Sequence, residues 1–145
     1  MNTLYLDKTQ TSKAADILKN GGTVAIPTET VYGLAANTFD EEAVKNIFKA
    51  KGRPSDNPLI VHISKISDIY DVVSEFPEKA KKLADKFWPG PLTMILPKNK
   101  NIPYCVTCGM DSVAVRFPSH KIAREIIEKS GSPSVEYRGT ISSRL

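Results

Sequence analysis

Short strand patterns and amphipathic helix patterns follow one another along the whole chain of 145 residues. The first helix is expected over residues 11–20 and stops at two glycines, after which residues 23–26 form a buried strand that Pro27 closes. Further helices are expected over residues 40–51, 66–73, 77–87 and 119–131. Further strands are expected over residues 3–6, 59–63, 92–96 and 112–117. No repeat, linker or low-complexity run divides the chain, so the pattern predicts one α+β domain with a mixed sheet.

The composition is that of an ordinary globular domain. Hydrophobic residues make up 41% and charged residues 25% of the chain, which excludes a disordered chain. The longest apolar stretches, such as residues 59–61, are too short to cross a bilayer, so we expect no membrane partner. The first residues include Asp7 and lack the apolar part of a secretory signal, and the chain has 2 cysteines. These features predict a cytoplasmic protein.

Basic residues exceed acidic residues by a small margin. The chain has 20 Lys and Arg against 16 Asp and Glu, which gives a formal net charge of +4. This balance permits attraction to nucleotides or RNA. A solvated basic surface explains the same excess, so net charge alone does not assign a nucleic-acid partner.

Polar side chains gather directly after the strand expected at residues 23–26. Residues 27–33 read PTETVYG, which puts Thr28 and Thr30 at the carboxyl end of a buried strand. Small ligands often bind at such positions in α/β folds. The alternative is that both threonines only hydrogen-bond turn amides. Gly33 is expected where the backbone must pass a neighbour closely.

A second polar cluster surrounds the end of the helix expected at residues 40–51. Lys51 and Arg53 flank a glycine, and Asn57 and His62 follow. Two cations here can converge on a phosphate, arginine as a bidentate fork and lysine as a point charge. Favourable placement of cations at the C-terminus of a helix is the alternative. His62 lies in an apolar strand, where a lone histidine is more often a hydrogen-bonded structural residue.

The strand expected over residues 112–117 carries a third candidate. Side chains alternate along a strand, so Ser112 and Arg116 share one face while Val113 and Val115 share the other. A guanidinium at a strand end suits a carboxylate or a phosphate. A structural salt bridge is the alternative.

Cys105 and Cys108 form a CxxC motif in a segment that we expect to be a loop. A thioredoxin-like site would place the motif at the start of a helix after a strand, and a structural zinc site needs four ligands. Only His62 and His120 could complete that ligand set, and their spacing is unlike that of a zinc finger. We therefore expect two inert thiols and no metal held by the protein.

Four segments resemble signatures of the YrdC/Sua5 family. They are PTETVYGL at residues 27–34, KGRP with NPL within residues 51–59, WPGPLT at residues 88–93 and VAVRFP at residues 113–118. Their shared order, over the chain to about Gly131, makes the resemblance highly specific. It implies a single YrdC-like domain with a twisted mixed parallel and antiparallel sheet, flanking helices and a broad positive cavity.

The resemblance also implies an activity. Members of this family are L-threonylcarbamoyladenylate synthases, nucleotidyltransferases that form threonylcarbamoyl-AMP from L-threonine, bicarbonate and ATP and release pyrophosphate. The product serves the threonylcarbamoyl modification of adenosine 37 in tRNA. Carried over by motif position, Thr30, His62 and Arg116 would bind L-threonine, with Arg116 facing its carboxylate.

The family's nucleotide site carries over in the same way. Lys51, Arg53, Asn57 and Ser112 would bind ATP, and the family usually has threonine where Ser112 stands. Mg²⁺ would arrive with ATP, because no dedicated metal cage is visible in the sequence. Implied partners are tRNA or double-stranded RNA and other tRNA threonylcarbamoylation proteins. The alternative, from a different class, is a non-catalytic double-stranded RNA- or nucleotide-binding module that keeps the basic cavity.

Residues 132–145 depart from the family pattern. The family continues with a Pro-Ser-Ala-Asn-type segment whose serine and asparagine help to bind ATP, whereas no asparagine follows Asn101 in this chain. We therefore expect an atypical tail, of the kind that a frame shift or a truncation produces, and an impaired activity. We also expect missing sheet strands, with an exposed sheet edge and apolar surface over residues 135–141.

Overall fold

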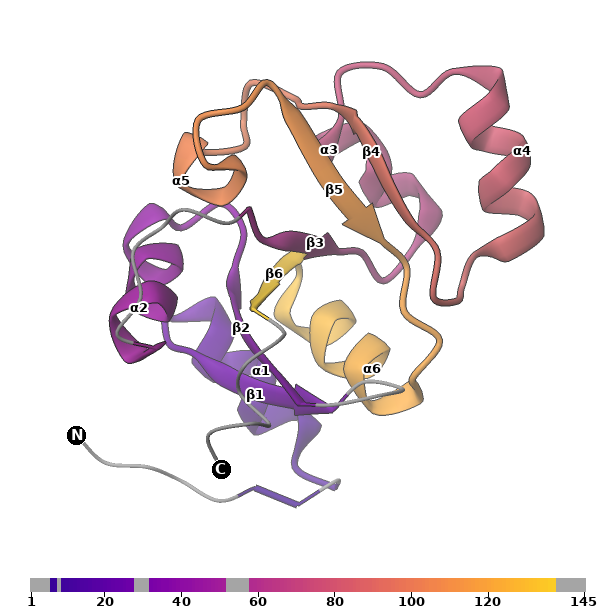
Figure 1. The fold of residues 1–145 in the computed structure, drawn as a ribbon. Helices are drawn as coiled ribbons and strands as arrows, with labels where there is room; N and C mark the ends of the chain where they lie inside the picture. Colours follow the sequence, from indigo (N-terminus) through magenta and orange to yellow (C-terminus); the bar gives the residue numbers. More distant parts are fainter. Residues whose placement is uncertain (1–5, 8, 28–31, 52–57, 138–145) are drawn as a thin grey trace.

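The computed structural model describes residues 6–7, 9–27, 32–51 and 58–137, and a mixed sheet lies at its centre (Figure 1). Within these residues the sheet has six strands in the order β1-β2-β6-β3-β5-β4. In this part of the chain β3 and β5 pair in parallel, and the other neighbouring strands pair antiparallel. The predicted α+β domain with a mixed sheet is therefore confirmed. The strands are β1 Val24–Pro27, β2 Tyr32–Asn37, β3 Ile60–His62, β4 Thr93–Pro97, β5 Ser112–Arg116 and β6 Ser134–Tyr137.

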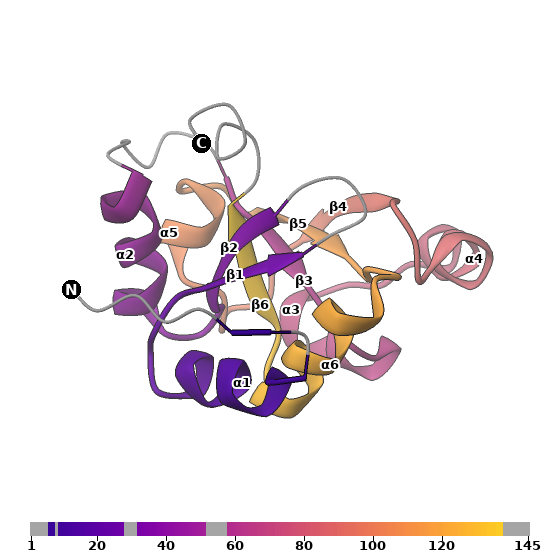
Figure 2. The ribbon, with the colours of Figure 1, turned by 90° about the horizontal axis from the view of Figure 1, so that it is seen from below.

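Helices flank both faces of the sheet, as their amphipathic patterns predict. They are α1 Thr11–Lys19, α2 Glu41–Lys51, α3 Ile69–Val72, α4 Glu78–Phe87, α5 Tyr104–Thr107 and α6 Lys121–Ser130, with a 3₁₀ turn at Ile66–Asp68. Both views show α1 beside α6, and these two helices pack with β1 and β2 (Figures 1 and 2). The other core contains α2 and α5. No helix in the described ranges is long and apolar enough to cross a membrane.

Alternate strand residues point to opposite faces of the sheet, so each face has its own side chains. Val61, Val115 and Val135 are fully buried in the larger core. Ala35 belongs to the smaller core beside α1 and α6 and is the cross-strand partner of Glu136. Because cross-strand partners share a face, Glu136 and the residues in register with it on β3 and β5 point away from the larger core.

Two predicted helix ends can be compared with the structure. The Oδ1 of Asp40 accepts a hydrogen bond from the Ala43 N–H at 3.2 Å, which confirms Asp40 as the N-cap of α2. Ser119 is not the N-cap of α6, because the helix begins after His120, whose side chain makes no capping bond. Gly131 ends α6 with a φ of 81°, a conformation that glycine adopts at no steric cost.

The structure corrects the expectation of missing strands and an exposed sheet edge after residue 134. Residues 134–137 form β6, which lies between β2 and β3 in the middle of the sheet (Figure 2). All four residues are buried, and Val135 has an exposed fraction of 0%. The prediction is wrong for this segment because β6 pairs on both sides. Residues 138–141 lie outside the described residues.

Candidate functional site

Three neighbouring strands bring polar side chains together on one face of the sheet. His62 on β3 is the register partner of Arg116 on β5 in the parallel pair, and of Ser134 on β6 in the antiparallel pair. Glu136 lies two residues beyond Ser134 on the same face. The structure therefore brings together two of the predicted site residues, His62 and Arg116, and adds Ser134 and Glu136 to them.

His62 and Arg116 are both deeply buried, with exposed fractions of 1% and 2%. Burial of a charged or polar side chain is costly unless hydrogen bonds compensate it. The Nε of Arg116 donates a hydrogen bond to the backbone oxygen of Gly90 at 3.1 Å. This bond fixes the plane of the guanidinium, as recognition of a planar carboxylate requires.

The loop that follows α4 holds the backbone oxygen of Gly90 in place. The Gly90 N–H donates to the backbone oxygen of Phe117 at 2.8 Å, directly after Arg116. The Nε1–H of Trp88, a buried side chain, donates to the oxygen of Leu92 at 2.7 Å and closes the loop on itself. The WPGPLT segment thus acts as a support for Arg116, a role that motif spacing alone does not reveal.

The imidazole of His62 has protein oxygens beside both of its nitrogens. Nδ1 lies 3.2 Å from the backbone oxygen of Ile60, and Nε2 lies 2.8 Å from Oε2 of Glu136. The second contact is short but lacks the alignment of a hydrogen bond, because Nε2 makes no hydrogen bond within the described residues. Glu136 is itself buried, with an exposed fraction of 4%. A histidine and a glutamate thus share one enclosed part of the site.

Gly33 makes room for this carboxylate. A Cβ atom at residue 33 would overlap the side chain of Glu136. The sequence predicts a close approach at Gly33, which is confirmed, but the neighbour is a side chain rather than backbone. Sequence reasoning missed Glu136 as a site residue because nothing in a one-dimensional pattern pairs residue 136 with residues 33 and 62.

Several buried polar atoms of the site lack a hydrogen bond within the described residues. They are Nε2 of His62, Oγ of Ser134 and Oε1 of Glu136. Buried polar atoms are hydrogen-bonded in the great majority of cases, and exceptions tend to mark functional positions. Such atoms are typical of a site that completes its hydrogen bonds with a ligand.

Ser112 lies on the same face as Arg116, as the strand pattern predicts, but at the other end of β5. It is half-buried. On the neighbouring strand β4, Ile95 is the register partner of Ala114, two residues after Ser112, and is 72% exposed. This face of the sheet is therefore open to solvent at the β4 edge, where a ligand can approach the residues of β5.

Four predicted site positions cannot be placed against this geometry. Thr30, Arg53 and Asn57 lie outside the described residues. Lys51 is the last residue of α2, and its side chain also lies outside the described part. The predicted ATP contacts of these residues therefore stay predictions.

Cys105 lies in α5, and Cys108 follows its end with a φ of 56°, so the expectation of a loop is wrong at this point. The two cysteines do not form a disulfide with each other. Burial raises the pKa of the Cys105 thiol, and the nearby Glu41 raises that pKa further. Both causes disfavour the reactive thiolate. The described residues hold no group of three or more side chains that could bind a metal ion.

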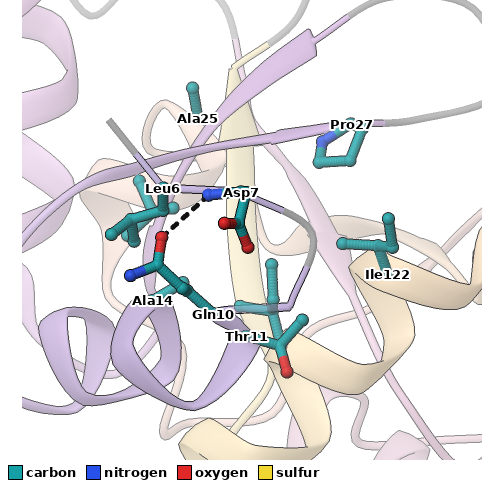
Figure 3. A pocket seen from close by; sticks show the side chains of 10 residues that line it. Leu6, Asp7, Gln10, Thr11, Ala14, Ala25, Pro27 and Ile122 are labelled. Carbon is teal, nitrogen blue, oxygen red and sulfur yellow. Dashed lines mark hydrogen bonds between the residues drawn. The ribbon is translucent and has the colours of Figure 1, made fainter. Parts of the chain in front are cut away.

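A separate pocket lies between α1, β1 and α6 (Figure 3). Its walls are mostly apolar, from side chains such as Ala14 and Ile122. At its rim the Asp7 N–H donates to Oε1 of Gln10 at 2.9 Å, and hydrogen bonds from Thr9 lower the pKa of Asp7. None of the described residues that line this pocket is a buried charged side chain, whereas buried charged and polar side chains gather on the strands that carry His62.

Sequence and structure both relate the chain to known proteins. Residues 16–143 match the Sua5/YciO/YrdC family, described as Telomere recombination. The chain is 52% identical over 131 residues to a threonylcarbamoyl-AMP synthase of Pyrococcus abyssi, an alignment that covers 90% of this chain. It is 53% identical over 125 residues to a synthase of the same name from Bacillus subtilis, covering 86% of this chain. A crystal structure of P. abyssi Sua5 complexed with L-threonine matches 92% of this chain with a TM-score of 0.87 and 49% identity.

These relatives are longer than the chain. The matched part spans 38% of the P. abyssi synthase and 36% of the B. subtilis synthase. It spans 39% of the crystallised Sua5 chain. The similarity thus covers less than half of the length of each of these relatives.

Proposed function

The chain belongs to the Sua5/YciO/YrdC family, and on this premise we propose that it is a threonylcarbamoyl-AMP synthase domain. The reaction would join L-threonine, bicarbonate and ATP and release pyrophosphate. The observation that carries this proposal is the adjacency of His62 and Arg116 on the face of the sheet that points away from the larger core. The names of the relatives and the L-threonine complex of P. abyssi Sua5 support the same substrate.

Arg116 would bind the carboxylate of L-threonine. Its guanidinium is already oriented by the hydrogen bond to Gly90, so less side-chain entropy is lost when a ligand binds. A guanidinium matches a carboxylate with two parallel hydrogen bonds. His62 and Thr30 would contact the rest of the amino acid, including its hydroxyl. That arrangement leaves the amine of threonine as the group that reacts.

Two bonds form in the proposed sequence. The threonine amine attacks the carbon of bicarbonate or of the carbon dioxide derived from it, and a carbamate forms with loss of water or a proton. An oxygen of this carbamate then attacks the α-phosphorus of ATP, and the bond to pyrophosphate breaks. Both partners of the second step are anionic, so Lys51 and Arg53 would reduce their repulsion while orienting them.

ATP would enter as its magnesium complex, with phosphate oxygens and water as the main ligands of the ion. Asn57 and Ser112 would complete the nucleotide contacts. Because the product modifies tRNA, we place the activity in the cytoplasm, with tRNA and other tRNA threonylcarbamoylation proteins as partners. Weak binding of double-stranded RNA would follow from the basic charge balance.

Pyrophosphate release by the purified 145-residue chain tests the proposal. We expect release that requires ATP and is stimulated by L-threonine and bicarbonate together, with threonylcarbamoyl-AMP identified by mass spectrometry. The Arg116→Ala variant should lower this release. Retained ATP or RNA binding without any pyrophosphate release would instead support the non-catalytic binding module.

A further inference from the structure

Glu136 is a buried acidic side chain, and one of its two carboxyl oxygens has no hydrogen bond within the described residues. Oε2 lies 2.8 Å from Nε2 of His62, without the alignment of a hydrogen bond, and Oε1 has no hydrogen bond within the described residues. The side chain is only 4% exposed. Buried carboxylates are normally paired and hydrogen-bonded on both oxygens. Oε1 is therefore left without a partner in this part of the chain, and the backbone of β6, not this side chain, makes the pairing with β2 and β3.

The carboxylate fills space inside the candidate site. It lies over Gly33, at the place where any other residue would have its Cβ atom. It also takes the Nε2 side of the His62 ring, while the oxygen of Ile60 takes the Nδ1 side. A ligand that hydrogen-bonds His62 through a ring nitrogen therefore has to displace one of these oxygens. Between a backbone oxygen in a sheet and a side-chain carboxylate, the side chain is the movable one.

We propose that Glu136 is an intramolecular occupant of the amino-acid site and thereby sets its affinity for substrate. The inference rests on the proposed function, in which His62 and Arg116 bind L-threonine. In that arrangement His62 contacts the part of the substrate beyond its carboxylate, so Glu136 and the substrate compete for the Nε2 side of the same imidazole. The charge of Glu136 also repels the carbamate that forms from the substrate. Residue 136 thus lowers the affinity of the site, because its side chain must leave before the amino acid binds.

Calorimetric titration with L-threonine tests this inference on the full chain. We expect Glu136→Ala to bind L-threonine about tenfold more tightly than the unmodified chain, a gain of about 1.4 kcal/mol. The matched control is Glu128→Ala, at an exposed position of α6, which should bind like the unmodified chain. Equal or weaker binding by Glu136→Ala overturns the proposal.

A second measurement uses stability and needs no ligand. Gly33→Ala adds a Cβ atom that overlaps Glu136, so it should lower the Tm of the unmodified chain by more than it lowers the Tm of Glu136→Ala. An equal Tm change in both backgrounds contradicts the occupied space and overturns the proposal. If the Tm changes differ as expected but neither Glu136→Ala nor the unmodified chain binds L-threonine, the proposed function is wrong and the role of Glu136 falls with it.

Discussion

The Nε of Arg116 donates a hydrogen bond to the backbone oxygen of Gly90, which lies 3.1 Å away and 26 positions earlier in the sequence. The Gly90 N–H in turn donates to Phe117, the residue after Arg116, at 2.8 Å. The loop between α4 and β4 and the end of β5 therefore hold each other. Through these two hydrogen bonds the WPGPLT segment orients the guanidinium of Arg116.

Replacing Arg116 with alanine should weaken L-threonine binding by about 10- to 150-fold, since charge-assisted hydrogen bonds contribute about 1.5–3 kcal/mol. Arg116→Lys should recover only part of this loss, because an ammonium group cannot make the bidentate contact. Isothermal calorimetry measures both variants. Arg124→Ala is the matched control, because it also removes a guanidinium, one that lies on α6 over the Phe117 ring. This control should bind L-threonine like the unmodified chain. Unchanged affinity in Arg116→Ala would move the carboxylate contact to another residue.

Replacing Gly90 with alanine should disturb Arg116 without touching it. The added Cβ atom would overlap the backbone oxygen of Phe87, so the loop has to shift. We expect a loss of stability of about 1–3 kcal/mol, as for other overpacked sites, together with weaker L-threonine binding. Thermal unfolding and calorimetry measure the two effects. An alanine that leaves both quantities unchanged would show that the loop does not support the guanidinium.

The alternation of strand side chains was predictable from the sequence, and with it the shared face of Ser112 and Arg116. The pairing of Arg116 with His62 was not predictable from this alternation, because the register between β3 and β5 is set by tertiary packing rather than by local pattern. Glu136 was missed for a related reason. The departure of residues 132–145 from the family pattern suggests a lost strand, yet Val135 still fits the larger core and β6 forms in place.

L-threonine should bind more tightly than L-valine, which has a methyl group in place of the hydroxyl. In the proposed site His62 and Thr30 would contact that hydroxyl, and losing it would leave buried groups unpaired at a cost of about 1–3 kcal/mol. Competition calorimetry with the two amino acids gives the difference directly. Equal affinities would count against a hydroxyl-binding role for this region.

Cys105 should react slowly with iodoacetamide near neutral pH. Burial and then Glu41 raise the pKa of its thiol above the ordinary value, and only the thiolate is alkylated. Because the folded-state pKa is the higher one, the thiol contributes stability below the ordinary thiol pKa that is lost as the pH rises past it. Glu41→Gln should accelerate alkylation, whereas Glu42→Gln should not, and peptide mass spectrometry would quantify both. Equal rates in the two variants would remove Glu41 as a cause.

β6 lies at the centre of the sheet, so its buried residues should contribute to the free energy of unfolding. A dispensable tail would not contribute. Val135 has an exposed fraction of 0%, contacts the larger core and pairs with Val61 and Ala36 on either side. Its replacement by alanine should cost about 2 kcal/mol, from lost transfer free energy and a residual cavity. Val24→Ala, at a half-buried position of the edge strand β1, is the matched control and should cost less than half as much. Urea unfolding of both variants decides the matter. If Val135→Ala is no more destabilising than Val24→Ala, β6 does not hold the centre of the sheet, and Glu136 is not fixed beside His62.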